Sequence, residues 1–299
     1  MLIRDGQGER ELPAWVPPGT DLDVPNAARM YDYALGGYHN FAIDRDMVKR
    51  AETGTPGARR VAHANRAFLG RAVRWLVVSG IRQFLDLGSG IPTLGNVHEV
   101  AQKAAPDARV VYVDVDPVAV QHSAMLLAGN PLADVIQADV RRPADVLASR
   151  AVADLLDFTK PVAVLMIAVL HFVSDADDPA GIVAQFTNAL VPGSFVAISH
   201  GTRPPERLED VRTIRQLYKR TPTPLHLRDR REVAKLVAGL QVVEPGVVPV
   251  SDWHPDPDEV ADVIRDELLV VLARKAGNPD GSAASRGVSP GTGPEQRRI

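Results

Sequence analysis

Apolar residues along this chain follow two alternating patterns. Short runs that are almost wholly apolar are separated by longer segments in which apolar residues recur every three or four positions. The first pattern is typical of strands buried on both faces, and the second of amphipathic helices. We therefore predict an α/β fold with a mostly parallel sheet. The predicted strands lie at residues 84–87, 109–113, 134–137, within the apolar run 160–172, at 190–200, and in a closing pair at 240–250 and 268–274.

The segment 61–80 has a clear helical period and predicts a long helix. Its apolar stripe consists of Ala64, Phe68, Ala72, Trp75 and Leu76. Gly80 ends the helix. We interpret Asn65 and Arg66 as solvated helix residues rather than ligands. Further helices are predicted at residues 26–35, 96–104 and 205–220, with others opened by Asp44, near Pro117, and by Asp229 with Glu232.

A glycine turn follows the strand at 84–87. Gly88, Ser89 and Gly90 leave the backbone open to close approach by a ligand, and the helix 96–104 comes next. Strand, glycine turn and helix form the opening unit of a nucleotide-binding sheet, although a lone G-x-G is a weak signal. Asp86 strengthens it, because a carboxylate inside an apolar strand is costly unless it meets a partner.

Acidic residues also follow the next two strands. Asp114 and Asp116 come at the end of the second strand, and Asp139 at the end of the third. In a Rossmann-like sheet the acidic residue after the second strand accepts hydrogen bonds from ribose hydroxyls. Asp116 suits a helix cap before Pro117, so we assign the ribose to Asp114.

Composition narrows the class of protein. The 299 residues, 45% hydrophobic and 24% charged, suffice for one sizeable core. A net charge of -3 provides no broad basic field, so we expect no nucleic-acid partner. No apolar run approaches the roughly 20 residues that span a bilayer, and the N-terminus lacks a signal-peptide core. With no cysteine, the chain is expected to be a soluble cytoplasmic protein without a membrane partner.

The segment 24–50 concentrates aromatic residues around Gly36 and Gly37. They are Tyr31, Tyr33, Tyr38, His39 and Phe41. One interpretation is a packing arm that covers the edge of the core. The other is a lid over a ligand, with aromatic faces for a cation, in which Tyr31, Gly37 and His39 contact a cofactor. The sequence does not separate the two.

The order of these motifs resembles class I S-adenosylmethionine-dependent methyltransferases. The segments DLGSG at 86–90, VDVDP at 113–117, QADV at 137–140, VLHFVSD at 169–175 and LVPG at 190–193 match successive motifs of that class. More closely, the arm at 25–41 and the segments 63–76 and 95–117 resemble an actinobacterial family described as S-adenosyl methyltransferase. That resemblance extends to Lys275, and the substrates of the family are largely undefined. The chain departs from the class in carrying Pro92 where the first motif has its third glycine.

The resemblance implies S-adenosyl-L-methionine as cofactor. Gly88 and Gly90 would shape the turn, Asp86 would support the methionine end, and Asp139 would meet the adenine amino group. The acidic pocket suits a ligand that carries sulfonium and ammonium charges. A dinucleotide would instead favour a glycine at Thr93, which disfavours a dehydrogenase.

Two histidines stand where neighbouring strands should end. His171 and His200 could both face the ligand, and either could act as a general base if the acceptor must lose a proton. Alternatively, both are hydrogen-bonded structural histidines. The acidic run 174–179 is better explained by Asp178 capping a helix at Pro179 than by a metal, so no metal is assigned.

These patterns divide the chain into a flexible N-terminus (1–23), a cap arm (24–60), a methyltransferase domain (61–275) and a disordered tail (276–299). The loop at 251–259, with Trp253 and His254, is interpreted as a polar turn rather than part of the pocket. We expect methyl transfer to an O, N or C nucleophile of a small molecule. The alternative is a catalytically silent S-adenosylmethionine-binding sensor or partner protein. Neither the acceptor nor the oligomeric state follows from the sequence.

Overall fold

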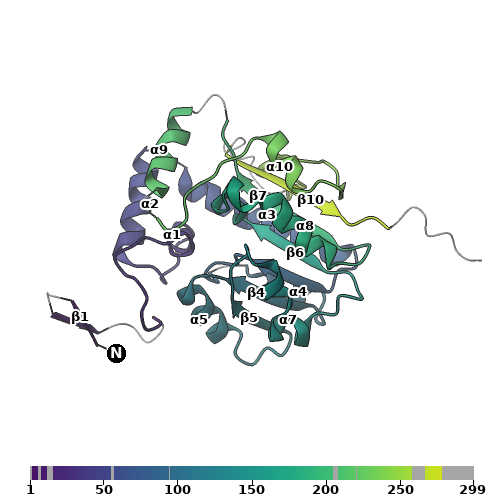
Figure 1. Cartoon of the computed structure of the whole chain (residues 1–299), viewed down its shortest axis with the longest axis horizontal. Helices are drawn as coiled ribbons and strands as arrows, with labels where there is room; N and C mark the ends of the chain where they lie inside the picture. Colours follow the sequence, from purple (N-terminus) through teal and green to yellow (C-terminus); the bar gives the residue numbers. More distant parts are fainter. Residues whose placement is uncertain are drawn as a thin grey trace, which may run out of the picture.

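The computed structural model describes residues 2–5, 8–11, 16–54, 57–93, 95–204, 208–219, 221–257 and 267–277. The predicted tail falls almost wholly outside these ranges, as do both ends of the predicted helix 205–220. The N-terminus forms an antiparallel hairpin of β1 (Leu2–Asp5) and β2 (Gly8–Glu11), at the edge of the molecule in Figure 1. The division of the chain into four parts remains a prediction.

In the described ranges one sheet holds eight strands, in the order β5-β4-β3-β6-β7-β10-β8, with β9 also paired to β10. The strands from β3 to β7 are parallel, and β10 runs antiparallel to β7. This arrangement confirms the predicted Rossmann-like sheet with a closing antiparallel strand. The bounds are β3 Gln83–Leu87, β4 Arg109–Asp114, β5 Ala133–Gln137, β6 Ala163–Ile167, β7 Phe195–Gly201, β8 Gln241–Val242, β9 Val248–Pro249 and β10 Leu268–Arg274.

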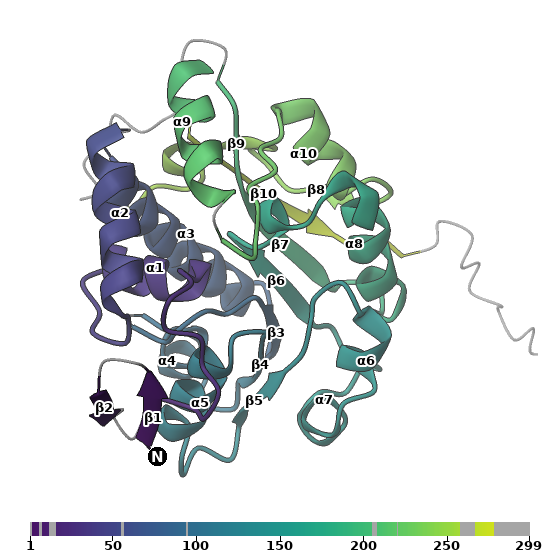
Figure 2. The ribbon, with the colours of Figure 1, turned by 60° about the vertical axis from the view of Figure 1, so that its left-hand side comes forward.

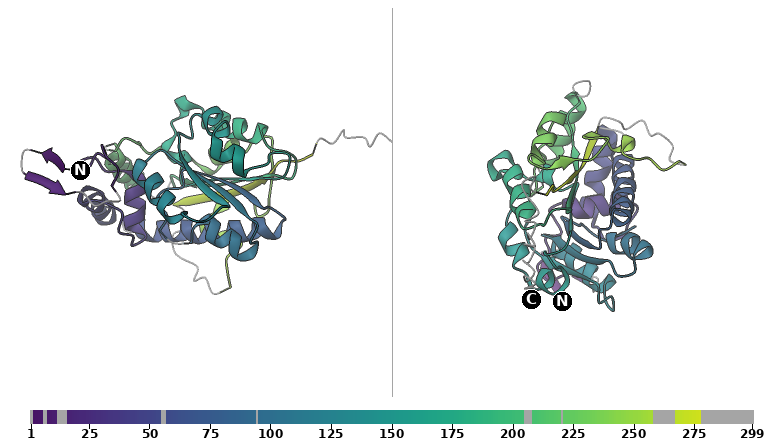
Figure 3. Two further views of the ribbon diagram at one scale, coloured as in Figure 1. Left: turned by 90° about the horizontal axis from the view of Figure 1, so that it is seen from below. Right: turned by 90° about the vertical axis from the view of Figure 1, so that its right-hand side faces the viewer.

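Helices cover both faces of the sheet (Figure 3). Alternate residues of each strand point to opposite faces, so Phe84 packs with α3 and α4 while Leu85 packs with α6, α7, α8 and α10. Every residue of β3 is buried, including the polar Gln83 and Asp86, as expected for a central strand covered on both faces. The helices are α3 Ala58–Val78, α4 Val97–Ala104, α5 Pro117–Leu126, α6 Pro143–Leu147, α7 Arg150–Leu155, α8 Pro179–Asn188 and α10 Arg230–Leu236.

Helix boundaries largely follow the predicted capping residues. Asp116, Asp178 and Asp229 each accept a backbone hydrogen bond at the start of α5, α8 and α10. The predicted strand 240–250 is wrong in extent, because β8 and β9 are two-residue strands separated by a turn. The polar-turn interpretation of the loop after β9 is also wrong for Trp253, which is fully buried with its ring edge-on to Phe68.

A helical cap covers one end of the sheet, formed by α1 (Ala27–Ala34), α2 (Ala42–Gly54) and α9 (Leu208–Tyr218) in Figure 2. Asn26 caps α1 as predicted, whereas α2 begins before Asp44. The buried Arg29 lies 3.6 Å from Asp44 and 3.7 Å from Asp116 at the start of α5. Since removal of one partner leaves a buried charge uncompensated, these contacts fix the cap on the sheet domain.

Candidate functional site

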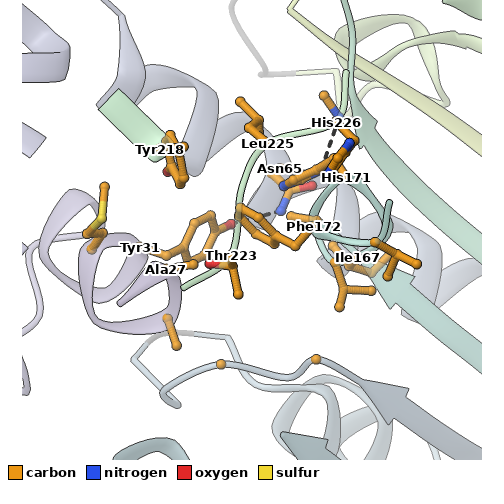
Figure 4. A pocket seen from close by; sticks show the side chains of 18 of the residues that line it. Ala27, Tyr31, Asn65, Ile167, His171, Phe172, Tyr218, Thr223, Leu225 and His226 are labelled. Carbon is orange, nitrogen blue, oxygen red and sulfur yellow. Dashed lines mark hydrogen bonds between the residues drawn. The ribbon is translucent and has the colours of Figure 1, made fainter. Parts of the chain in front are cut away.

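A cavity of about 510 Å³ lies between the carboxyl ends of the strands and the helical cap (Figure 4). Ligands bind at this end of open parallel sheets, because the loops after the strands meet there. Of the residues predicted to form the site, Tyr31, Asp86, Gly88, Gly90, Asp114, Asp139 and His171 line the cavity. Gly37, His39 and His200 lie outside its lining.

The turn after β3 requires glycine at two positions for different reasons. Gly88 has φ +68°, and a Cβ there would overlap the side chain of Val169. Gly90 has φ +67° with no atom within 4 Å of where a Cβ would stand. The backbone N–H of Gly88 donates to the carbonyl of Val113 at 2.8 Å, which ties the turn to β4. The turn therefore exposes bare backbone to the cavity.

Asp114, at the end of β4, holds the other side of this turn. Its Oδ2 accepts from the Gly90 N–H at 2.7 Å, and its Oδ1 accepts from the Asp116 N–H at 2.9 Å. Burial raises the pKa of Asp114 to about 6 despite these bonds. Each carboxylate oxygen keeps a further lone pair for a ligand hydroxyl.

Asp86 faces a cation that sequence analysis missed. Burial raises the pKa of Asp86 to about 7, while the Arg66 charge opposes that rise and the Asp114 charge adds to it. Arg66, interpreted from the sequence as a solvated residue, is half-buried and lines the cavity. Arg66 Nε and Ser89 Oγ are buried, and neither has a hydrogen-bond partner among the described residues. Buried polar atoms of this kind indicate a ligand or water.

Asp139 lies in the cavity lining after β5. The Arg141 side chain donates to both carboxylate oxygens, through Nε at 3.0 Å and 2.9 Å and through Nη2 at 2.6 Å. These hydrogen bonds lower the pKa of Asp139, so the group is ionised at neutral pH. Arg141 thereby fixes the orientation of an acceptor at the rim of the cavity.

His171 lies on the 3₁₀ turn Leu170–Phe172 after β6 and lines the cavity. The backbone N–H of Gly201 donates to its Nδ1 at 3.2 Å. Burial lowers the pKa of His171 well below its usual value, and the nearby His200 and Arg228 lower it further. The ring is therefore neutral, and because Nδ1 accepts, the proton is on Nε2.

His200 is fully buried and belongs to a structural network. Its Nδ1–H donates to the carbonyl of Gly201 at 2.7 Å, and its Nε2 accepts from Arg228 Nη1 at 2.9 Å. Arg228 also donates to the carbonyls of Leu170 and Val173, both at 2.9 Å. The network ties the loop after β6 to β7, and so fixes the position of His171.

A chain of hydrogen bonds connects the cap to two strand ends. Asn65 Nδ2 donates to the Tyr31 hydroxyl at 2.9 Å (Figure 4). That hydroxyl donates to the carbonyl of Ala62 at 3.0 Å. Ser199 Oγ donates to Asn65 Oδ1 at 2.5 Å and accepts from the Ala168 N–H at 2.9 Å. The prediction that Asn65 is solvated is wrong, since it is buried.

The remaining arm residues surround Asp32. Its carboxylate accepts from the His39 N–H at 2.9 Å, from Asn40 Nδ2 at 2.8 Å and from the Thr93 hydroxyl at 2.7 Å. Gly37 is packed so closely against this carboxylate that a Cβ would overlap it. Gly37 and His39 thus lie beside a bond that joins the arm to the loop after the glycine turn, and their cofactor contacts remain predictions.

Metal-ligand groups and membrane-spanning helices are both absent from the described ranges. No group of three or more His, Asp or Glu side chains could hold a metal ion there. No helix in that part of the chain is long and apolar enough to cross a bilayer.

The fold and this cavity define a class I S-adenosylmethionine-dependent methyltransferase. The strand order, the glycine turn and the acidic residues at successive strand ends are the features of that class. The sequence model of the S-adenosyl methyltransferase family matches residues 13–276, so the chain belongs to that family and is an enzyme that uses S-adenosylmethionine. The alternative of a catalytically silent binding protein is not favoured.

Two solved structures are similar over nearly their whole length. A DUF574 family protein from Streptomyces avermitilis MA-4680 is 39% identical, with a TM-score of 0.81 over 85% of this chain and 99% of the other. A candidate methyltransferase from Thermobifida fusca YX is 36% identical, with a TM-score of 0.82 over 89% of this chain and 100% of the other. No curated protein matches the chain.

Proposed function

We propose that this enzyme methylates a small molecule held between the strand ends and the helical cap. The observation that carries the proposal is the continuity of the cavity. The glycine turn, Asp114 and Asp139 line one end, and mostly apolar side chains of α1, α2 and α9 line the other. A cofactor and an acceptor in one cavity can meet directly, and positioning of the two supplies much of the rate enhancement of a transfer reaction.

The lining residues fit S-adenosylmethionine, whose bound form supplies a methyl group on a positively charged sulfur. Gly88 and Gly90 allow the close backbone approach that the ligand needs. Asp114 would accept hydrogen bonds from the ribose hydroxyls, and Asp139 would accept one from the adenine amino group. Both carboxylates have free lone pairs on oxygens that the protein already orients.

The methionine end would lie near Asp86. This carboxylate is buried, so a cationic ammonium would compensate its charge. Arg66 Nε and Ser89 Oγ are buried donors without described partners on the same side of the cavity, which suits a carboxylate. The Tyr31 ring lies over the Arg66 guanidinium, with 5.8 Å from ring centroid to Cζ, and would close this end of the site.

Calorimetry tests the cofactor site. S-adenosylmethionine and S-adenosylhomocysteine should both bind, and NAD should bind much more weakly. Tight NAD binding without a response to either sulfur compound would contradict the proposal. Transfer of a labelled methyl group should then be measured on a panel of small molecules and on a bulk protein and RNA control. Turnover only on the macromolecules would refute a small-molecule acceptor.

A further inference from the structure

The acceptor end of the cavity is apolar on most of its surface. The Phe172 and Tyr218 rings lie there with their centroids 5.7 Å apart (Figure 4). The arginines among the described lining residues, Arg66 and Arg141, stand near Asp86 and Asp139 at the cofactor end. An aromatic molecule would bury its ring against such an apolar surface. The apolar wall consists of Met30, Val48, Ala51, Leu69, Phe172, Ile214, Tyr218 and Leu225.

His171 lines this cavity and has one ring nitrogen that no described residue bonds. Gly201 occupies its Nδ1, so Nε2 carries the proton, and no described residue bonds Nε2. A general base needs a free lone pair on the nitrogen that faces the substrate. His171 could provide one only after the loss of the Gly201 hydrogen bond. With its proton on Nε2, His171 can donate a hydrogen bond there but cannot accept a proton as a general base would.

The donor restricts the nucleophile. A neutral amine has one lone pair, and a hydrogen bond from His171 would use the pair needed for attack. An aliphatic alcohol would need a base to remove its proton. An ionised phenol has several lone pairs on oxygen, so it can accept from His171 and still attack.

We propose that the acceptor is an ionised phenol whose ring packs on the apolar wall and whose oxygen accepts a hydrogen bond from His171 Nε2–H. This inference rests on the proposed function. The phenol loses its proton to water before it binds. The phenolate oxygen then forms the bond to the methyl carbon as the carbon–sulfur bond breaks, and that electron pair goes to sulfur. No proton is transferred to the protein.

The charged groups around His171 favour this role. His200 and Arg228 pack against it from β7 and the segment before α10, and Arg228 pairs with Asp175. His226, whose N–H donates to the carbonyl of His171 at 2.7 Å, lines the same cavity. Arg228 lowers the pKa of His171 and so disfavours a positive charge on its ring, which keeps His171 a neutral donor.

The test uses 4-nitrophenol, whose ionised form absorbs visible light, with the S-adenosylhomocysteine complex of the whole chain. A pH titration of the wild-type complex should show the bound phenol ionising at lower pH than the free phenol. His171→Gln keeps an N–H donor and should bind the phenolate within about threefold of wild type. His171→Leu should bind it about tenfold or more weakly, as expected for loss of a hydrogen bond to a charged group. His63→Gln, on the exposed side of α3, is the matched control.

Three results would overturn the inference. They are preferential binding of neutral 4-nitrophenol, equal affinity of wild type and a folded His171→Leu variant, or failure of 4-nitrophenol to bind the complex. Loss of turnover on phenols in His226→Gln but not in His171→Gln would also overturn it. Calorimetry with S-adenosylhomocysteine alone separates these failures from failure of the proposed function, which would appear as no binding of the nucleoside itself.

Discussion

Replacement of Asp114 by asparagine tests the cofactor end of the site. In the wild-type protein the two Asp114 carboxylate oxygens accept from the N–H groups of Gly90 and Asp116 and keep lone pairs for the ribose. An asparagine would present an NH₂ group to one of these backbone donors, so the turn would shift and a ligand acceptor would be lost. Hydrogen bonds to charged groups contribute about 1.5–3 kcal/mol. We expect S-adenosylhomocysteine to bind about 10- to 150-fold more weakly.

Calorimetry above pH 7 measures this loss with Asp114 ionised, because its pKa is about 6. Thermal unfolding of the variant establishes that it folds. Asp134→Asn, on the exposed side of β5 and outside the cavity lining, is the matched control and should leave the affinity unchanged. An Asp114→Asn variant that folds and binds as tightly as wild type would show that the ribose does not lie against this carboxylate.

The remaining predictions concern stability and the arm. Because burial raises the pKa of Asp86 to about 7, the ligand-free protein should lose stability as pH rises from about 4, where an unfolded aspartate ionises, to about 7. Asp86→Asn should melt higher than wild type near pH 9 but not near pH 4, and equal melting temperatures at both would contradict the burial argument. Gly90→Ala should lower the free energy of unfolding by about 1–2 kcal/mol, because alanine is strained in the left-handed backbone conformation of this position. Gly88→Ala should lower it further, because the added Cβ would also overlap Val169. Chemical denaturation that ranks the two variants in the opposite order would refute this reasoning. S-adenosylhomocysteine should slow hydrogen exchange in residues 27–54 more than in 58–78, and equal slowing would assign the arm a packing role only.

The sheet and the cofactor end were largely predictable from local sequence. The glycine turn and Asp114 follow directly from a strand pattern, since each motif stands at the point where an apolar run stops. Capping residues such as Asp178 likewise act within one turn of their position. These features depend on neighbours in the chain, so the sequence carries them.

The contacts that join distant segments around the cavity were not predictable from local sequence. Asn65 and Arg66 read as ordinary polar helix residues, although Asn65 falls on the buried face that also carries Phe68 and Ala72, which was an available signal. For Arg228 the sequence contained no such signal, because its partners Leu170, Val173 and His200 come from other parts of the chain. For the same reason the sequence could not show which nitrogen of His171 is free.

The chain of hydrogen bonds from Tyr31 through Asn65 to Ser199 limits how the enzyme can be recombined. Each of these residues comes from a different segment, and each satisfies a buried group of the next. A chimera that imports only a foreign arm would leave a buried amide or hydroxyl unpaired, at a cost of about 1–3 kcal/mol for each group. In α9, by contrast, Ile214 and Tyr218 face the cavity and take no part in this chain. Altered acceptor specificity is therefore more easily engineered by exchanging α9 than by exchanging the arm.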